Sequence, residues 1–423
     1  MEIPVVESNR EYLIENYNQV RNLWTRLCKP LVPEDYVLQT SAGASPAKWH
    51  LAHTSWFFEQ FILKNHFKGY KEFHPDYNFL FNSYYNSVGK FLDRQARGMI
   101  SRPPIEDVQS YRKYVDEHMN ALFDQLLGEQ WNEVVPLLEL GINHEQQHQE
   151  LFLMDIKNIF YENPVRPVYH EIKSEDPQLP AFEWIEHEAG IEVIGRTENG
   201  FCYDNEKPAH KTYVQAVKLA NRPVLNGEYL EFVESGGYKD SRYWLSDGWD
   251  TITERNWQAP LYWDKNEGSW EQFTLGGTKK LNEKEPVSHL SFYEADAYAR
   301  WKGLRLPTEF EWERNAAKQP VEGNFMDSGR FHPEPPRQTD QALQHLFGNL
   351  WEWTGSPYLG YPGYSALADG VGEYNGKFMC NQFVLRGGCC ATPKNHMRLT
   401  YRNFYYPHDR WAFNGLRLAD DNS

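Results

Sequence analysis

Two histidines stand four residues apart in His144-Glu-Gln-Gln-His-Gln-Glu-Leu-Phe152, a segment with the composition of a helix. Positions i and i+4 of a helix lie on one face with their Cβ atoms about 6 Å apart, so both imidazoles can bind one metal ion. The spacing therefore predicts a metal site at His144 and His148. Taken alone, an HxxxH pair is as often structural as metal-binding.

A third metal ligand has to come from another segment. The candidates are His50 and His53, in Trp49-His-Leu-Ala-His-Thr-Ser-Trp56. Three imidazoles without a carboxylate or thiolate tolerate Zn(II) or Fe(II), and they leave coordination positions open for a substrate or dioxygen. Spacing alone does not choose between these metals, and a lone histidine in an apolar helix is usually a hydrogen-bonded core group.

The elements that position these histidines have helical periodicity. Apolar residues recur at three and four spacing in much of the first 160 residues, and the clearest helical runs are Ile105–Leu127, which follows Pro103-Pro104, and Trp131–Tyr161. Within the latter, Pro136 predicts a helix start or a kink. Four long helices with one extended connection, His66–Arg102, predict a four-helix bundle with a functional crossover loop.

Composition narrows the class of protein. A chain of 423 residues predicts two or three domains, and its net charge of -16 disfavours nucleic acid and anionic membranes as partners. The acidic N-terminus does not resemble a signal peptide, and no stretch approaches the roughly 20 apolar residues of a membrane-spanning helix. We expect a soluble, cytoplasmic protein, and the sequence leaves its oligomeric state open.

The character of the chain changes near residue 170. We predict a helical bundle over 1–165, a proline-containing linker over 166–180 and a second domain over 181–423. Beyond the linker, glycine, tryptophan and turn residues dominate, and helical periodicity survives only in short runs such as Ser291–Trp301 and Glu309–Ala317. This pattern predicts an α+β domain with long aromatic-rich loops.

Motifs of the second domain occur in the order of a known family. They are Tyr203-Asp-Asn-Glu-Lys-Pro-Ala-His210, Pro223-Val-Leu-Asn226, Gly236-Gly-Tyr238, Arg305-Leu-Pro-Thr-Glu309, Gly348-Asn-Leu-Trp-Glu-Trp353 and Leu385-Arg-Gly-Gly388. This series resembles the formylglycine-generating-enzyme domains, whose fold is related to C-type lectins. Formylglycine generation needs a cysteine pair late in the domain, and Cys389-Cys390 differs from that pattern. We therefore expect this domain to bind substrate for the N-terminal metal site.

The first domain resembles the DinB-type bundles, which bind metal through three histidines. The resemblance implies His53, His144 and His148 as ligands, because His53 precedes Trp56-Phe-Phe58 in the family position. It leaves His50 to pack or hydrogen bond nearby.

The two domains together resemble the sulfoxide synthases of ergothioneine biosynthesis, the EgtB family. Shared motifs at the end of the chain are Thr400-Tyr-Arg-Asn-Phe404 and Arg410-Trp-Ala-Phe-Asn-Gly-Leu-Arg417. The resemblance implies nonheme Fe(II), dioxygen, hercynine (Nα-trimethylhistidine) and a thiol donor, either cysteine or γ-glutamylcysteine. The implied reaction joins the thiol sulfur to C2 of the imidazole and oxidises that sulfur to a sulfoxide.

A tyrosine that donates a proton can steer this reaction away from simple oxidation of the thiol. The candidates are Tyr84 and Tyr85 in the crossover loop, which resembles the family branch with N-terminal catalytic tyrosines.

Substrate contacts are expected from the charge types involved. A quaternary ammonium suits aromatic side chains and a carboxylate suits an amide or arginine, which favours Trp411, Phe413 and Asn414 for hercynine. Gln147 lies on the turn of the metal ligands and can face the imidazole. Arg94 and Arg97 are candidate clamps for the carboxylate of the thiol donor, although Gly89-Lys-Phe-Leu-Asp93 stands where the family often has a His-Pro-Arg run.

Two alternatives remain open at this point. One is another imidazole-coupling enzyme of the same fold, of the ovothiol type or using selenium. The other is a non-catalytic protein with a structural metal in the bundle and a sugar-binding lectin-like domain.

Overall fold

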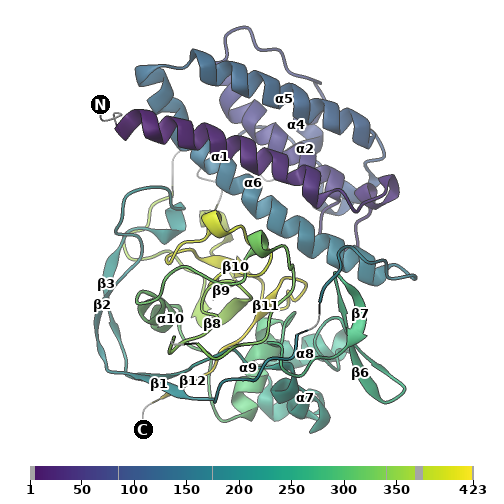
Figure 1. Cartoon of the computed structure of the whole chain (residues 1–423), viewed down its shortest axis with the longest axis vertical. Coiled ribbons are helices and arrows are strands. Elements are labelled where there is room, and N and C mark those ends of the chain that lie inside the picture. The colour runs from purple at the N-terminus through teal and green to yellow at the C-terminus, as the bar shows by residue number, and fades with distance from the viewer. Residues whose placement is uncertain (1–4, 84, 174, 340, 367–374, 422–423) are drawn as a thin grey trace. The chain divides into compact units, whose positions relative to one another are not determined.

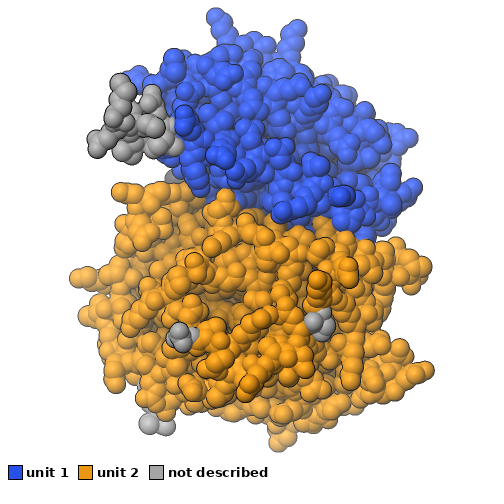
Figure 2. Space-filling model, viewed as in Figure 1, with its two compact units in different colours: residues 1–162, 368–373 blue, residues 163–367, 374–423 orange. Residues whose placement is uncertain are grey.

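The computed structural model describes residues 5–83, 85–173, 175–339, 341–366 and 375–421. Within these ranges the chain forms two compact units, one that ends at Glu162 and one that begins at Asn163 (Figures 1 and 2). The first unit is helical, and the second combines short helices with small sheets. This architecture confirms the predicted fold class of a helical bundle followed by an α+β domain.

Four helices form the body of the first unit, and their bounds are α1 (Val5–Leu27), α2 (Ala47–Phe58), α5 (Ile105–Gln125) and α6 (Gly128–Glu162) (Figure 1). The two predicted runs correspond to α5 and α6. Helix α5 begins after Pro104 and has Glu106 and Asp107 in its first turn. Negative charges at this end interact favourably with the helix dipole and stabilise the helix. Pro136 lies inside α6, so it does not mark the helix start.

Helix α2 is enclosed on all sides, because every residue from Ala47 to Phe58 is buried. The helix continues through a π-helical turn, Glu59–Leu63, into the short α3 (Lys64–His66). The carboxylate of Glu59 accepts hydrogen bonds from the hydroxyls of Tyr70 and Tyr111 at 2.6 and 2.7 Å. A buried helix of this kind can present polar side chains to a site that excludes water.

The crossover loop contains two short helices that the sequence did not predict, α4 (Tyr77–Phe81) and the 3-10 helix η3 (Arg94–Met99). Each is too short to give a periodic signal. The indole nitrogens of Trp49 and Trp56 donate to Leu80 O and Asn78 Oδ1 at 3.2 and 2.9 Å. These bonds hold α4 against α2.

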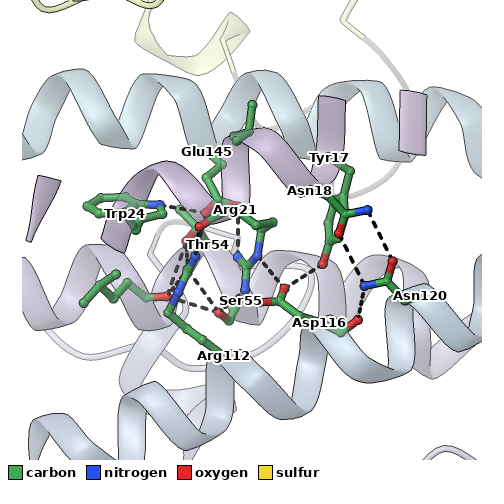
Figure 3. A network of polar contacts seen from close by, with 12 residues as sticks. Tyr17, Asn18, Arg21, Trp24, Thr54, Ser55, Arg112, Asp116, Asn120 and Glu145 are labelled. Carbon is green, nitrogen blue, oxygen red and sulfur yellow. Dashed lines mark hydrogen bonds and ion pairs between the residues drawn. The ribbon is translucent and has the colours of Figure 1, made fainter. Parts of the chain in front are cut away.

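A buried polar network ties the four bundle helices together around Glu145 of α6 (Figure 3). The Glu145 carboxylate accepts from Arg21 Nη1 at 2.9 Å, from Arg112 Nη2 at 3.0 Å and from Trp24 Nε1 at 2.7 Å. Arg21 also donates to Ser55 Oγ of α2 at 2.9 Å. Burial alone would lower the pKa of Arg21, but the neighbouring carboxylates raise it above its usual value.

The second unit is built around a sheet with strand order β10-β9-β8-β11. Its strands are β8 (Trp351–Pro357), β9 (Phe383–Arg386), β10 (Asn403–Tyr405) and β11 (Asn414–Gly415). The helices α9 (Phe292–Trp301) and α10 (Glu309–Ala316) match the two predicted short runs. Thr308 and Glu311 form a capping box that starts α10, which explains part of the Arg305–Glu309 motif.

Smaller elements complete the second unit (Figure 1). One three-stranded sheet contains β1 (Trp184–His187), β4 (Val217–Ala220) and β12 (Ala419–Asp421). A two-stranded sheet contains β2 (Gly190–Ile194) and β3 (His210–Val214). Another three-stranded sheet contains β5 (Trp263–Asn266), β6 (Ser269–Thr274) and β7 (Gly277–Lys280). Two further helices are α7 (Asn226–Glu234) and α8 (Ser246–Glu254). The Cys389 and Cys390 side chains are fully buried. Among the described residues, no helix has the length and apolar character needed to cross a membrane.

The Glu145 network predicts a large stability effect. Glu145→Gln removes the charge that Arg21 and Arg112 share, and we expect a loss of about 3–5 kcal/mol in the free energy of unfolding. Urea unfolding of the full chain, followed by far-UV circular dichroism, measures this loss. Glu117→Gln is the control, because the Lys113–Glu117 pair is exposed (78% and 62%) and should contribute no more than about 0.5 kcal/mol. Equal midpoints for the two variants would contradict the role of Glu145.

Candidate metal centre

The structure brings His53 of α2 together with His144 and His148 of α6. One ring nitrogen from each histidine lies within 4.8 Å of the other two. The ring centroids are 4.6 Å apart for His144 and His148, 4.7 Å for His53 and His148, and 4.9 Å for His53 and His144. The exposed fractions of the three residues are 0%, 2% and 9% in chain order, so the cluster is nearly closed to solvent.

The three imidazoles are held in the neutral form. Burial and, to a smaller extent, the neighbouring His50 lower the pKa of His144 to about 3. Burial is also the main reason that the pKa values of His53 and His148 fall well below the usual value, with a further lowering from His144. Because a histidine must be deprotonated to bind a metal, these surroundings favour the binding form.

A backbone carbonyl fixes the tautomer of His53. Its Nδ1 lies 2.6 Å from the carbonyl oxygen of Phe81, at the end of α4. Because a carbonyl only accepts, Nδ1 carries the proton and Nε2 carries the lone pair. This buried Nε2 has no hydrogen-bond partner among the described residues. A nitrogen that binds a metal is expected to lack such a partner when the metal is absent.

Aromatic rings fix the orientation of His53. Trp49 stacks on it with ring centroids 4.4 Å apart and an interplanar angle of 17°, and Trp56 stacks at 5.5 Å and 15°. The guanidinium carbon of Arg97 lies 3.4 Å from the Trp49 ring centroid. Arg97, one of the predicted substrate clamps, is only 3% exposed and donates to Ser45 Oγ and Ser83 Oγ, at 2.9 Å in each case.

His148 is linked to a second histidine and then to a carboxylate. Its Nδ1 lies 2.8 Å from Nδ1 of His50, and Nε2 of His50 lies 3.0 Å from Oδ2 of Asp155. The backbone N–H of Ser45 donates to the same carboxylate oxygen at 2.8 Å. His50 is therefore outside the ligand group and hydrogen bonds next to it.

Of the two predicted tyrosines, the structure describes only Tyr85. Tyr84 lies outside the described residues. Tyr85 is fully buried, and its ring centroid is 5.6 Å from that of Trp56 and 5.3 Å from that of Phe61. Trp56 is therefore in ring contact with both Tyr85 and His53.

The other predicted contacts of the first unit differ in exposure. Gln147 is half-buried on the same turn of α6 as His148. Arg94 is exposed at the start of η3, where it donates to the carbonyl oxygen of Gly43. The structure thus has Gln147 on α6 and Arg97 against Trp49 of α2, and it leaves Arg94 at the surface.

The hercynine candidates of the second unit lie at β11. Trp411 is half-buried, whereas Phe413 and Asn414 have no exposed surface. The Phe413 ring centroid is 4.9 Å from that of His289. The Asn414 side-chain amide forms no hydrogen bond with any residue that the structure describes. A buried amide without a hydrogen bond lowers the stability of a folded protein by about 1–3 kcal/mol, and a ligand that bonds to the amide would remove this penalty.

Sequence reasoning missed Phe81 and Asp155. No pattern marks the Phe81 carbonyl, because its position follows from the packing of α4. Asp155 did carry a signal, since His148 and Asp155 are seven residues apart and so share one face of α6.

Comparisons with known proteins agree with both domains. Residues 16–152 match the DinB superfamily, and residues 171–422 match the sulfatase-modifying factor enzyme 1-like domain. These matches confirm the two predicted domain families.

Three relatives have informative names. A hercynine oxygenase of Mycobacterium tuberculosis is 30% identical over 408 residues, which are 89% of this chain and 91% of the relative. A hercynine oxygenase of Mycolicibacterium smegmatis is 31% identical over 308 residues, 67% of this chain and 71% of the relative. The ergothioneine biosynthesis protein 1 of Schizosaccharomyces pombe is 30% identical over 239 residues, 52% of this chain and 27% of the relative.

The cluster predicts a measurable metal site. Replacing His53, His144 or His148 singly by alanine should abolish stoichiometric Fe(II) binding in anaerobic titrations of the full chain, because two imidazoles leave an incomplete site. His118→Ala is the control, since His118 lies on α5 outside the cluster, where its Nδ1 hydrogen bonds to the Tyr114 carbonyl and its ring packs against Phe67 and Tyr70. Full Fe(II) stoichiometry in any of the three ligand variants would contradict the assignment.

Proposed function

The chain belongs to the hercynine oxygenase family, and from this membership we propose that it is a nonheme Fe(II)- and dioxygen-dependent sulfoxide synthase. It forms a C–S bond between C2 of hercynine and the sulfur of cysteine or γ-glutamylcysteine, and it oxidises that sulfur. The observation that carries the proposal is the buried three-histidine cluster inside a chain that matches one hercynine oxygenase over 89% of its length.

The donor set fits Fe(II). Three neutral imidazoles converge, and Nε2 of His53 is the ring nitrogen opposite the Nδ1 that bonds to the Phe81 carbonyl. Without a carboxylate or thiolate from the protein, further coordination positions stay open for ligands. When bound, Fe(II) would activate dioxygen and bind the thiol sulfur.

The proposed reaction balances without another redox cofactor. Hercynine loses the hydrogen on C2, the thiol loses its hydrogen, and a C–S bond forms, which releases two electrons. Oxidation of the sulfide to a sulfoxide releases two more. Dioxygen accepts all four electrons, because one oxygen atom enters the sulfoxide and the other leaves as water with the two hydrogens.

Protein side chains have to protect this outcome, because direct oxidation of the thiol competes with coupling. Phe57, Trp49 and Trp56 exclude water around the cluster, since all three are buried and in ring contact with its histidines. Tyr85 is in ring contact with Trp56 and carries a hydroxyl that can donate a proton. We assign the steering role to Tyr85, while Tyr84 remains a candidate outside the described residues.

Substrate recognition is proposed in each unit separately. In the first unit, Arg97 supplies a positive charge for the donor carboxylate and Gln147 an amide for the imidazole, with Arg94 as a surface contact. In the second unit, the buried amide of Asn414 would bond to hercynine, and Trp411 and Phe413 would contact the quaternary ammonium.

The activity itself is tested with the full chain reconstituted anaerobically with Fe(II). Hercynine and either cysteine or γ-glutamylcysteine are then supplied under ¹⁸O₂, and products are identified by mass spectrometry. We expect a sulfoxide adduct that contains one ¹⁸O atom, and a preference for one donor identifies the thiol substrate. An Fe(II)-loaded protein that consumes no oxygen with any of these substrates would reject the proposed function.

Tyr85→Phe removes the hydroxyl and keeps the ring. We expect the rate of C–S coupling to fall by about 10²–10⁴-fold, the range for loss of a proton donor, while the sulfinic acid of the thiol accumulates. Tyr77→Phe is the matched control, because Tyr77 is buried in the same crossover loop. If Tyr85→Phe left the ratio of coupled product to sulfinic acid unchanged, the steering role would belong to another tyrosine.

A further inference from the structure

The outer nitrogen of His148 has an uncommon partner. A metal-binding histidine usually donates its second N–H to a carboxylate, a carbonyl or water. His53 follows this rule through the Phe81 carbonyl. His148 instead meets Nδ1 of His50 at 2.8 Å, and the carboxylate of Asp155 is one residue further away, at 3.0 Å from Nε2 of His50.

Proton positions in this chain of contacts follow from the acceptor at its end. In the hydrogen-bonded chain, Nε2–H of His50 donates to the carboxylate of Asp155, which leaves the lone pair of the His50 ring on Nδ1. That lone pair must accept a hydrogen bond from Nδ1–H of His148. The proton of His148 is then on Nδ1, and its Nε2 lone pair is left for the metal.

We propose that Asp155 and His50 form a relay that sets the tautomer and the orientation of His148. Both are positioning residues, since they act on the metal through His148. The inference rests on the proposed metal site and adds to it a reason why the nitrogen that faces the cluster is the one without a proton.

The surroundings of the relay strengthen it. His50 and Asp155 are 1% and 3% exposed, and hydrogen bonds between buried groups are stronger than the same bonds in water. The backbone N–H of Ser45 holds Oδ2 of Asp155 in place at 2.8 Å. Because His50 belongs to α2 and Asp155 to α6, the relay also links the two helices that supply the metal ligands.

Two substitutions at His50 separate this role from simple packing. Glutamine can donate from its amide nitrogen to Asp155 and accept at its oxygen from His148, whereas leucine can do neither. We expect His50→Leu to weaken binding of Fe(II) by about 10–100-fold, the usual cost of losing an outer partner of a metal-binding histidine. His50→Gln should bind Fe(II) with nearly the wild-type affinity.

The tautomer is read directly from the wild-type protein, which guards against a variant that folds poorly. In the metal-free full chain with ¹⁵N-labelled histidine, two-bond correlations distinguish Nδ1–H from Nε2–H rings, and the signal of His148 is assigned by its loss in His148→Ala. We expect His148 as the Nδ1–H form. Finding it as the Nε2–H form would overturn the relay, as would wild-type Fe(II) affinity in His50→Leu. Absence of Fe(II) binding in the wild-type protein would instead reject the metal site.

Discussion

The buried carboxylate of Glu145 is the contact on which the geometry of the proposed metal site depends. It receives guanidinium groups from α1 and α5, and Arg21 extends the network to Ser55 of α2 (Figure 3). Glu145 follows His144 directly, and Ser55 is two residues from His53. A shift of α2 against α6 would therefore break hydrogen bonds of the buried Arg21 guanidinium, which water could not replace. Leaving a buried charge without its partners strongly destabilises a protein. Hydrophobic packing alone would tolerate such a shift more easily.

Helix α6 thus uses its faces for different tasks. One face carries Glu145 and Gln149, whose amide donates to the Val20 carbonyl of α1 at 2.7 Å. Another carries His144, His148 and Asp155 toward α2. On the first face one carboxylate, Glu145, binds two guanidinium groups, and on the second the imidazoles of His144 and His148 lie near Asp155, which His50 contacts.

The sequence predicted those features that a short repeat of residue types marks. Helices α5 and α6 and the His144–His148 pair follow from three and four spacing, and the motifs of the second domain identified its family. Contacts between distant segments carried no such signal. The Phe81 carbonyl reaches His53 through an unpredicted helix of five residues, and His50 meets Asp155 across 105 positions. Arg97 was predicted as a clamp from its charge, but no sequence pattern indicated its stacking on Trp49.

The central claim is that three histidines from two helices bind one iron through the nitrogens left without protons. A crystal structure of the full chain loaded anaerobically with Fe(II), with anomalous diffraction recorded at the iron edge, tests this claim most directly. The account predicts one strong iron peak within coordination distance of Nε2 of His53 and Nε2 of His148, with His144 as the third ligand and His50 still bonded to Asp155. An iron peak bound by His50, or located away from the α2–α6 histidines, would contradict it.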